Sequence, residues 1–255
     1  MSPDGQNPRT IAHERVDRPL AGFARDYAPG DDTGWHSHAR AQLLYASQGV
    51  MRVATEAAAF VIPPGRALWL PARARHDVRQ EGVVRMRALF LRADAALPDA
   101  APLVLGVGPL LHALVLAACD EPLEWDEHGR GGHLAALILD ELRRAPRLPF
   151  AVPAPRDARL RRLADALAQD PASALTLDAW AAQCGASART LARLFQAETG
   201  MGFARWRQTP RLAEAAALLA QGATPAQAAA RVGYASAPAF GAAYRAAFGI
   251  TPKGR

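Results

Sequence analysis

Residues 177–195 of this chain read LDAWAAQCGASARTLARLF, and this stretch decides the fold of its C-terminal part. Apolar residues recur at helical spacing on both sides of Gly185, a residue that readily adopts the positive φ of a sharp turn. Ser187 is a preferred N-cap residue, so we expect a second helix to begin directly after it. The stretch therefore predicts two short helices joined by a tight turn, a helix-turn-helix.

The second of these helices is expected to turn an apolar face to the core and a polar face to solvent. Leu191, Leu194 and Phe195 form the apolar face. The polar face carries hydroxyl, amide and guanidinium groups, which can bond phosphates and base edges. We expect Arg189 and Arg193 to bond guanine edges, with a phosphate contact as the alternative for either. The candidate DNA-binding residues of this unit are Ser187, Arg189, Thr190, Arg193 and Gln196.

A second unit of the same kind follows the first. Thr224, Pro225 and Gln227 predict a capping box at the start of a helix, and the chain turns again at Gly233. The outer face of the next helix is nearly all alanine, so we expect this unit to bind the DNA backbone and respond to DNA shape. Its candidate DNA-binding residues are Ser236 and Arg245.

Pro210 interrupts the helical pattern that joins the two units. A proline inside a helix removes one hydrogen bond and bends the helix. The sequence therefore predicts a kink, with Thr209 as the N-cap of a restarted helix and an altered spacing between the two units.

Net positive charge is confined to this C-terminal region. Residues 156–255 contain 13 Lys and Arg against 6 Asp and Glu, whereas residues 1–155 contain 17 against 18. Because the excess positive charge coincides with the two helix-turn-helix units, we expect double-stranded DNA to bind there.

The remaining composition narrows the class of protein. Cys119 and Cys184 lie far apart in apolar helical patterns, which predicts two reduced core thiols. No apolar run is long enough to span a membrane, and the N-terminus lacks the apolar stretch of a signal peptide. We therefore expect a cytoplasmic protein that does not bind membranes.

Between residues 20 and 92 short strands alternate with glycine and proline turns, which predicts a small β-barrel or jelly roll. Gln42–Ser47 and Val50–Thr55 are two candidate strands separated at Gly49, and Asp77–Gln80 and Val84–Leu91 are two more separated at Gly82. Helices are expected over Leu110–Ala118 and His133–Arg144. The second helix carries a broad apolar face that packs on the barrel or on a second subunit, and we favour a homodimer.

Four prolines close together in residues 145–156 exclude a helix and predict an extended linker. The predicted fold is therefore α+β, a β-barrel with linking helices followed by an all-α domain of two helix-turn-helix units. The expected parts are a flexible N-terminus at 1–18, a barrel at 19–97, a helical linking and dimerisation region at 98–145, a Pro-rich linker at 146–156 and a DNA-binding domain at 157–255.

Histidines are concentrated in the predicted barrel. His36 and His38 are expected to point to one face of a strand, and His76 comes from a later strand. Three imidazoles in one cavity can bind a divalent metal, with the Gln42 amide oxygen as a fourth ligand. An organic effector without metal and a purely structural role are the alternatives. The candidate effector-binding residues are His36, His38, Arg40, Gln42, Tyr45 and His76, and the candidate metal ligands are His36, His38, Gln42 and His76.

These histidines lie within two stretches that resemble the motifs of the cupin superfamily. Residues 30–49 resemble the first motif, G-x5-H-x-H-x3-E-x6-G, with Gln42 in place of the glutamate. Residues 65–80 resemble the second, G-x5-P-x-G-x2-H-x3-N, with Arg73 in place of the glycine and Gln80 in place of the asparagine. The resemblance implies a cupin β-barrel. Its implication of a metal is weakened because the Gln42 amide lacks the charge of a carboxylate.

The C-terminal region, Asp157–Arg255, resembles the AraC/XylS family of transcriptional regulators. The resemblance covers the first helix-turn-helix, the connecting helix with Arg211, and a family signature over the second unit. In this family a cupin-type barrel commonly senses an effector, and the C-terminal domain binds promoter DNA. The signature residues are Ala229-Ala230-Arg231-Val232-Gly233-Tyr234, Phe240, Tyr244, Arg245, Phe248, Gly249, Thr251 and Pro252.

The resemblance implies a transcription factor that binds promoter DNA as a homodimer and responds to a small molecule or a metal. Activation and repression both fit this organisation, and RNA polymerase is a further candidate partner. One alternative is a metal-dependent cupin enzyme with an appended DNA-binding domain, and another is an architectural DNA binder without an effector. The sequence shows no nucleophile–base pair, so we do not expect an enzyme.

Overall fold

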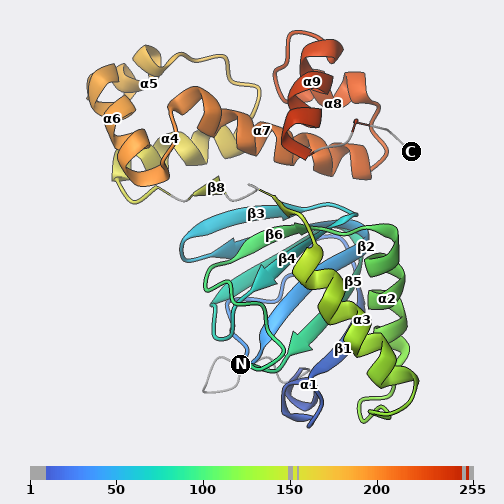
Figure 1. Ribbon diagram of the computed structural model, residues 1–255. Coiled ribbons are helices and arrows are strands. Elements are labelled where there is room, and N and C mark those ends of the chain that lie inside the picture. The colour runs from blue at the N-terminus through green and yellow to red at the C-terminus, as the bar shows by residue number, and fades with distance from the viewer. Residues whose placement is uncertain (1–9, 149–151, 154, 249–250, 253–255) are drawn as a thin grey trace. The chain divides into compact units, whose positions relative to one another are not determined.

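The structure is a computed structural model in which the chain forms two compact units (Figure 1). The first unit runs to Phe150, and the second consists of Ala151–Arg255 with the short segment Glu56–Ala59. The division after Phe150 falls inside the stretch 146–156 that the sequence predicts to be a linker. The described residues are 10–148, 152–153, 155–248 and 251–252.

The first unit is built on an antiparallel sheet, and the second is largely helical, so the predicted α+β class is confirmed. The pairing order in the sheet is β1-β5-β2-β4-β6-β7, while β3 pairs with β2 and with β8. The strands are β1 (Leu20–Tyr27), β2 (Ala41–Thr55), β3 (Ala58–Ile62), β4 (Arg66–Leu70), β5 (His76–Leu91), β6 (Leu103–Gly106), β7 (Arg147–Leu148) and β8 (Val152–Pro153).

Strands β2 and β5 are longer than the sequence predicts. Each was expected as two strands separated at a glycine, yet each continues through that glycine. The β2–β5 register shifts between Ala46 and Val50, which marks a bulge. Gly49 in this bulge has φ +81°, and a Cβ there would lie 2.3 Å from the Val83 carbonyl oxygen. The glycine therefore lets the strand bend without ending.

Helices α2 (Pro109–Asp120) and α3 (Arg130–Arg144) cover one face of the sheet (Figure 1). Trp69 is fully buried in the cluster between this face and the helices. Ile138 and Leu142 of α3 belong to the same cluster. Most of the apolar face of α3 thus packs on the barrel, and Leu137 remains 49% exposed.

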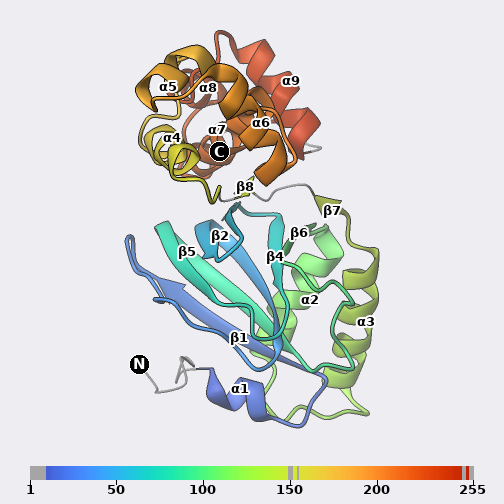
Figure 2. The same ribbon diagram turned by 90° about the vertical axis from the view of Figure 1, so that its left-hand side faces the viewer.

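Residues 10–18 belong to the stretch that the sequence predicts to be flexible, yet in the structure they adopt a defined conformation with long-range contacts. They form helix α1 (Ile11–Arg15) and the turn before β1, beside which α1 lies (Figure 2). Arg40 donates hydrogen bonds to the carbonyl oxygens of Val16 and Arg18, and the side chain of Glu14 is only 4% exposed. These long-range contacts hold a segment whose own sequence is polar.

The second compact unit of the chain, residues 151–255, contains both of the predicted helix-turn-helix motifs. The first consists of α5 and α6 and turns at Gly185 with φ +63°, and the second consists of α8 and α9 and turns at Gly233 with φ +76°. Helix α7 joins them. The helices are α4 (Ala158–Gln169), α5 (Leu177–Gln183), α6 (Ala188–Thr199), α7 (Phe203–Ala220), α8 (Pro225–Arg231) and α9 (Ala237–Phe248). Among the described residues, no helix is long and apolar enough to cross a membrane.

Helix α7 continues through Pro210, so the predicted restart at Thr209 is wrong. Instead of capping a new helix, the Thr209 hydroxyl donates to the Arg205 carbonyl oxygen one turn earlier. Trp206 and Leu212, on either side of the proline, are both buried. Their packing holds the helix together across the hydrogen bond that proline cannot make.

Arg211 on α7 joins both halves of the second unit. Its guanidinium donates hydrogen bonds to the carbonyl oxygens of Pro171, Ala172 and Ser173, which precede the first helix-turn-helix. It also donates to the carbonyl oxygen of Gly233, the turn of the second. Arginine carries five N–H donors in one fixed plane, so it can bond several carbonyl oxygens at once. By bonding to the backbone beside both helix-turn-helix motifs, Arg211 fixes the spacing between them.

We predict that replacing Arg211 by Met will lower the free energy of unfolding by about 2 kcal/mol, because several carbonyl oxygens lose a charged donor. Arg211→Lys should recover only part of this loss, since one ammonium cannot reach acceptors in several directions. Denaturant unfolding followed by far-ultraviolet circular dichroism measures the effect. Arg205→Met, which removes an exposed arginine from the same helix, is the control and should leave stability unchanged. Equal stability of the Arg211 and Arg205 variants would contradict the assigned role.

Candidate functional site

Three histidines converge in the first unit. His36 forms an isolated bridge with His76, the first residue of β5, through backbone hydrogen bonds of 3.0 and 2.9 Å in both directions. The ring centroid of His36 lies 4.3 Å from that of His76 and 4.8 Å from that of His38. One ring nitrogen from each residue lies within 4.8 Å of the others, and all three residues are buried. The predicted trio is therefore brought together.

The hydrogen bonds of the trio determine which ring nitrogen carries the proton. Nδ1 of His36 lies 2.7 Å from the Gly34 carbonyl oxygen, and Nδ1 of His76 lies 2.9 Å from that of Ala74. A carbonyl oxygen only accepts, so each Nδ1 is the donor. Burial lowers the pKa of His36 and lowers that of His76 to about 3, so both rings are neutral near pH 7. Their Nε2 atoms then carry lone pairs.

His38 is oriented by a carboxylate, that of Glu14, which the sequence does not predict to lie at this site. Its Nδ1 lies 2.8 Å from Oε1 of Glu14 on α1, and the backbone N–H of Ala39 donates to Oε2 at 2.7 Å. Thr10 donates a third hydrogen bond to Glu14. Burial by itself raises the pKa of Glu14, but these hydrogen bonds outweigh it and lower the pKa below its usual value. No local pattern in residues 10–18 indicates this contact.

Gln42 faces the same side of the sheet as the histidines. It pairs with Phe90 across β2 and β5, and directly opposed residues share a face. The Phe90 ring centroid lies 4.9 Å from that of His38. Gln42 is buried, and its Oε1 has no hydrogen-bond partner within the described residues. An amide oxygen without a partner is therefore available to a ligand on this side.

Gln80, at the last position of the second cupin motif, shares a face of β5 with His76 because the two are four residues apart. It is buried, and among the described residues neither of its amide atoms has a partner. Arg73 has φ +65° where the motif has glycine, and its N–H donates to the His38 carbonyl oxygen at 2.7 Å. The motif's backbone conformation thus survives the substitution.

Two predicted effector-binding residues are corrected. Tyr45 lies three positions from Gln42 on β2 and so faces the helices, where its hydroxyl is 2.6 Å from Nδ1 of His112 on α2. Arg40 uses its guanidinium to hold the carbonyl oxygens of Val16 and Arg18. Tyr45 therefore lies on the opposite face of the sheet from the site, and both terminal nitrogens of Arg40 bond to backbone carbonyl oxygens.

Helix α6 presents the predicted polar face. Ser187 caps it by accepting a hydrogen bond from the Thr190 N–H at 3.1 Å. Leu191 and Phe195 are fully buried, whereas Arg189 and Arg193 are exposed on the other side. Gln196 is exposed as well, and Thr190 is half-buried. The arrangement therefore leaves hydrogen-bond donors on one face of a helix whose other face is anchored.

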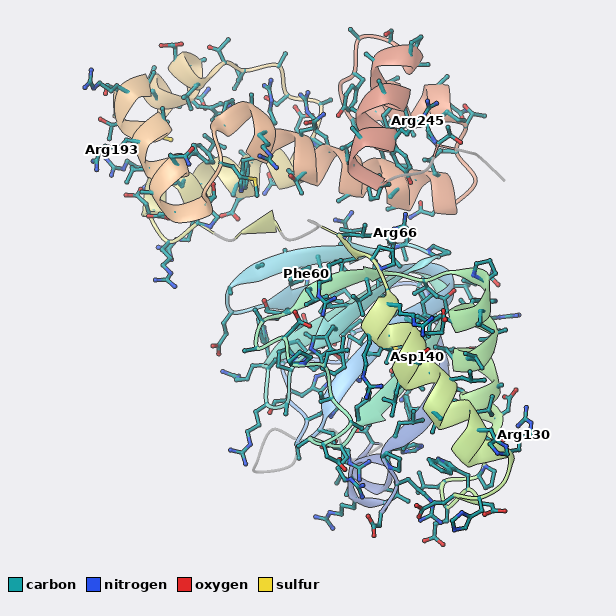
Figure 3. The ribbon with its side chains drawn as sticks, viewed as in Figure 1. Phe60, Arg66, Arg130, Asp140, Arg193 and Arg245 are labelled. Carbon is teal, nitrogen blue, oxygen red and sulfur yellow. The ribbon has the colours of Figure 1, made fainter. Side chains whose placement is uncertain are left out.

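Helix α9 differs from α6 in the chemistry of its outer face. The predicted capping box of α8 is present, and Ser236 caps α9 by accepting from the Ala239 N–H. Arg193 extends from α6 and Arg245 from α9, and both are exposed (Figure 3). The exposed residues just before α9 and in its first turns mostly carry no side-chain hydrogen-bond donor, namely Ala235, Ala237, Pro238, Ala239 and Ala242.

Comparison with known families agrees with both halves of the structure. A helix-turn-helix domain model matches residues 180–254, and a cupin domain model matches residues 24–92. The HTH-type transcriptional regulator NimR of Escherichia coli K12 is 28% identical over 217 residues, which are 85% of this chain and 80% of NimR. RipA of Corynebacterium glutamicum, also an HTH-type transcriptional regulator, is 39% identical over 119 residues, 47% of this chain and 34% of RipA.

Two kinds of solved structure align with the chain, one over most of its length and one over its C-terminal part. ToxT from Vibrio cholerae with bound unsaturated fatty acid aligns over 91% of this chain and 93% of its own, with a TM-score of 0.39 and 10% identity. The C-terminal domain of AraT from Geobacillus stearothermophilus aligns over 38% of this chain and 81% of its own, with a TM-score of 0.36 and 28% identity. The domain matches show an N-terminal cupin domain and a C-terminal helix-turn-helix domain, and together with the curated relatives they indicate a DNA-binding transcriptional regulator.

Proposed function

We propose that this regulator senses a divalent transition metal in its cupin domain and binds promoter DNA through α6 and α9, working in the cytoplasm where that DNA lies. The observation that carries the proposal is the hydrogen bonding of Nδ1 in the three histidines. Each Nδ1 lies beside an acceptor, the carbonyl oxygens of Gly34 and Ala74 or the carboxylate of Glu14. Each Nε2 is thereby left as a metal-binding lone pair, the pattern found around metal-ligating histidines.

The ligand set fits a borderline cation such as Zn²⁺, Co²⁺ or Ni²⁺. His36, His38 and His76 would supply imidazole nitrogens, and Gln42 would supply a neutral oxygen. The Nε2 of His76 is buried without a partner among the described residues, which supports a ligand at that atom. When bound, the cation would offer Lewis acidity to an anionic or carbonyl oxygen of an effector.

We predict that the full-length protein binds one equivalent of Co²⁺ or Zn²⁺ and that His76→Ala weakens this binding by at least tenfold, because one of three imidazole ligands is lost. The ligand-field spectrum of Co²⁺ reports the site directly. His112→Ala removes a histidine that lies on α2 against Tyr45, so it serves as the control and should bind normally. A wild-type protein that binds neither metal would overturn the proposal.

A metal-dependent cupin enzyme with an appended DNA-binding domain stays the alternative, because three protein ligands are also the number at many catalytic metal sites. The proposal that the chain is not an enzyme is supported by relatives that are named transcriptional regulators. Oxygen consumption or substrate turnover by the metal-loaded protein would favour the enzyme. An unchanged DNA affinity with and without metal or metabolites would instead favour an architectural DNA binder.

We further propose that α6 reads base edges while α9 mainly holds the backbone. Arg193→Ala should cost about 1–3 kcal/mol of binding to the natural promoter site and relax the preference for one base pair. Arg245→Ala should weaken binding to all DNA sequences equally. It should also reduce the slope of log affinity against log salt concentration by about 1, the value for one lost phosphate contact. Genomic binding-site mapping first identifies the natural promoter site. Fluorescence anisotropy with duplexes of this site and its single-base variants then measures the effects of both substitutions. Equal base dependence in the two adjacent grooves would contradict this division.

We propose that the protein acts as a homodimer, and RNA polymerase remains a proposed partner. Leu110 on α2 is 53% exposed and Leu137 on α3 is 49% exposed, and large exposed apolar side chains are typical of contact surfaces. The double variant Leu110→Glu, Leu137→Glu should therefore shift the protein towards the monomer in sedimentation velocity. Val83→Glu changes an exposed apolar residue on β5 and is the control. A wild-type monomer at all concentrations would refute the dimer.

A further inference from the structure

Glu14 contacts the candidate metal centre from outside the two cupin motifs. It comes from α1, whereas the three histidines come from β5 and from the segment before β2. Its Oε1 lies 2.8 Å from Nδ1 of His38, and both side chains are nearly inaccessible, with exposures of 4% and 2%. Among the described residues, it is the carboxylate that hydrogen-bonds to a histidine of the trio.

The chemistry of this contact differs from that of the other two histidines. His36 and His76 donate their Nδ1–H to neutral backbone carbonyl oxygens, of Gly34 and Ala74. His38 donates to a charged carboxylate, which is a stronger acceptor. A carboxylate behind an imidazole fixes the ring and makes its other nitrogen more basic. His38 is therefore the trio's most strongly electron-donating ligand.

The carboxylate also supplies charge that the ligands themselves lack. Three imidazoles and the amide of Gln42 are neutral, so none of them offsets the charge of a dication. Glu14 brings a negative charge one imidazole away, and its own hydrogen bonds from Ala39 and Thr10 hold it in place. The cupin motif has a negatively charged glutamate at the position of Gln42. In this chain Glu14 supplies a negative charge instead, from behind His38 and not as a metal ligand itself.

Glu14 also belongs to a segment with its own attachments. Residues 10–18 are held by Arg40 through the carbonyl oxygens of Val16 and Arg18, and Arg18 pairs with Glu127 at 3.2 Å. Neither attachment touches a histidine of the trio. The segment can therefore remain docked when the Glu14–His38 contact is weakened, which makes the contact testable by itself.

We propose that Glu14 is a positioning residue of the metal centre and that metal binding is coupled through it to the docking of residues 10–18. The inference rests on the proposed metal-sensing function. Because coupling between two equilibria is reciprocal, a metal held more tightly by the Glu14–His38 pair also holds this segment more tightly. The segment thereby reports whether the site is occupied.

The test is Zn²⁺ and Co²⁺ affinity of the full-length wild type, Glu14→Gln and Glu14→Asp, measured by competition with a chelator. Loss of a partner behind a metal ligand typically weakens binding about 10–100-fold, and we expect Glu14→Gln to fall in this range. Glu14→Asp keeps the charge and should recover part of the affinity. Glu127→Gln is the matched control, because it removes one negative charge from the surroundings of the same segment without contacting a histidine. Its affinity should equal that of the wild type.

Amide hydrogen exchange of residues 10–18, measured with and without metal, is a second test. If Glu14 only stabilised the fold, adding metal would not change this exchange. The amides of Glu14 and Val16 donate to the carbonyl oxygens of Thr10 and Ala12, so their exchange follows the integrity of α1. Metal should slow their exchange in the wild type and in Glu127→Gln, and it should do so much less in Glu14→Gln.

The outcomes separate two failures. A wild type that binds neither Zn²⁺ nor Co²⁺ overturns the metal-sensing function, and this inference with it. A wild type and a Glu14→Gln variant that bind with equal affinity overturn the positioning role alone. Equal losses in Glu14→Gln and Glu127→Gln would assign the effect to general charge and would also overturn it. Metal-independent exchange in the wild type would refute the coupling.

Discussion

The two backbone hydrogen bonds between His36 and His76 are the constraint on which the sensory half of the molecule depends. They join the segment before β2 to the start of β5, two parts of the chain that become neighbours only when the sheet is closed. His38 lies two residues from this junction and is fixed in turn by the Arg73 N–H on its carbonyl oxygen. The imidazoles therefore converge because the barrel folds, and no local segment assembles them alone.

The sequence predicts best those features that are determined within a few residues. The cap at Ser187, the capping box at Thr224 and the turn at Gly185 all depend on spacings of at most four positions, and all were predicted correctly. The bulge at Gly49 was taken for the end of a strand, because a glycine with positive φ serves both purposes. Which of the two it serves depends on the partner strand.

The candidate site shows the same limit at longer range. Spacing predicted His36, His38 and His76, because alternation in a strand and recurring motifs carry that information. The same alternation excludes Tyr45, which lies an odd number of positions from Gln42 and so faces the helices. Glu14 had no such signal, since its partner is 24 positions away and only the tertiary fold brings α1 to His38. Polar composition suggested flexibility where buried hydrogen bonds impose order.

The unequal helices of the second unit have a consequence for how the protein selects DNA. Arg211 binds carbonyl groups beside both helix-turn-helix units, so α6 and α9 are held at a set spacing and cannot adjust separately to a site. With donors concentrated on α6, one copy of the chain reads few base pairs directly. In the proposed homodimer a second copy would supply a second α6, and the product of two modest base preferences would reach a specificity that one helix cannot. The alanine surface of α9 therefore makes dimerisation more important for recognition than it would be with two equal reading helices.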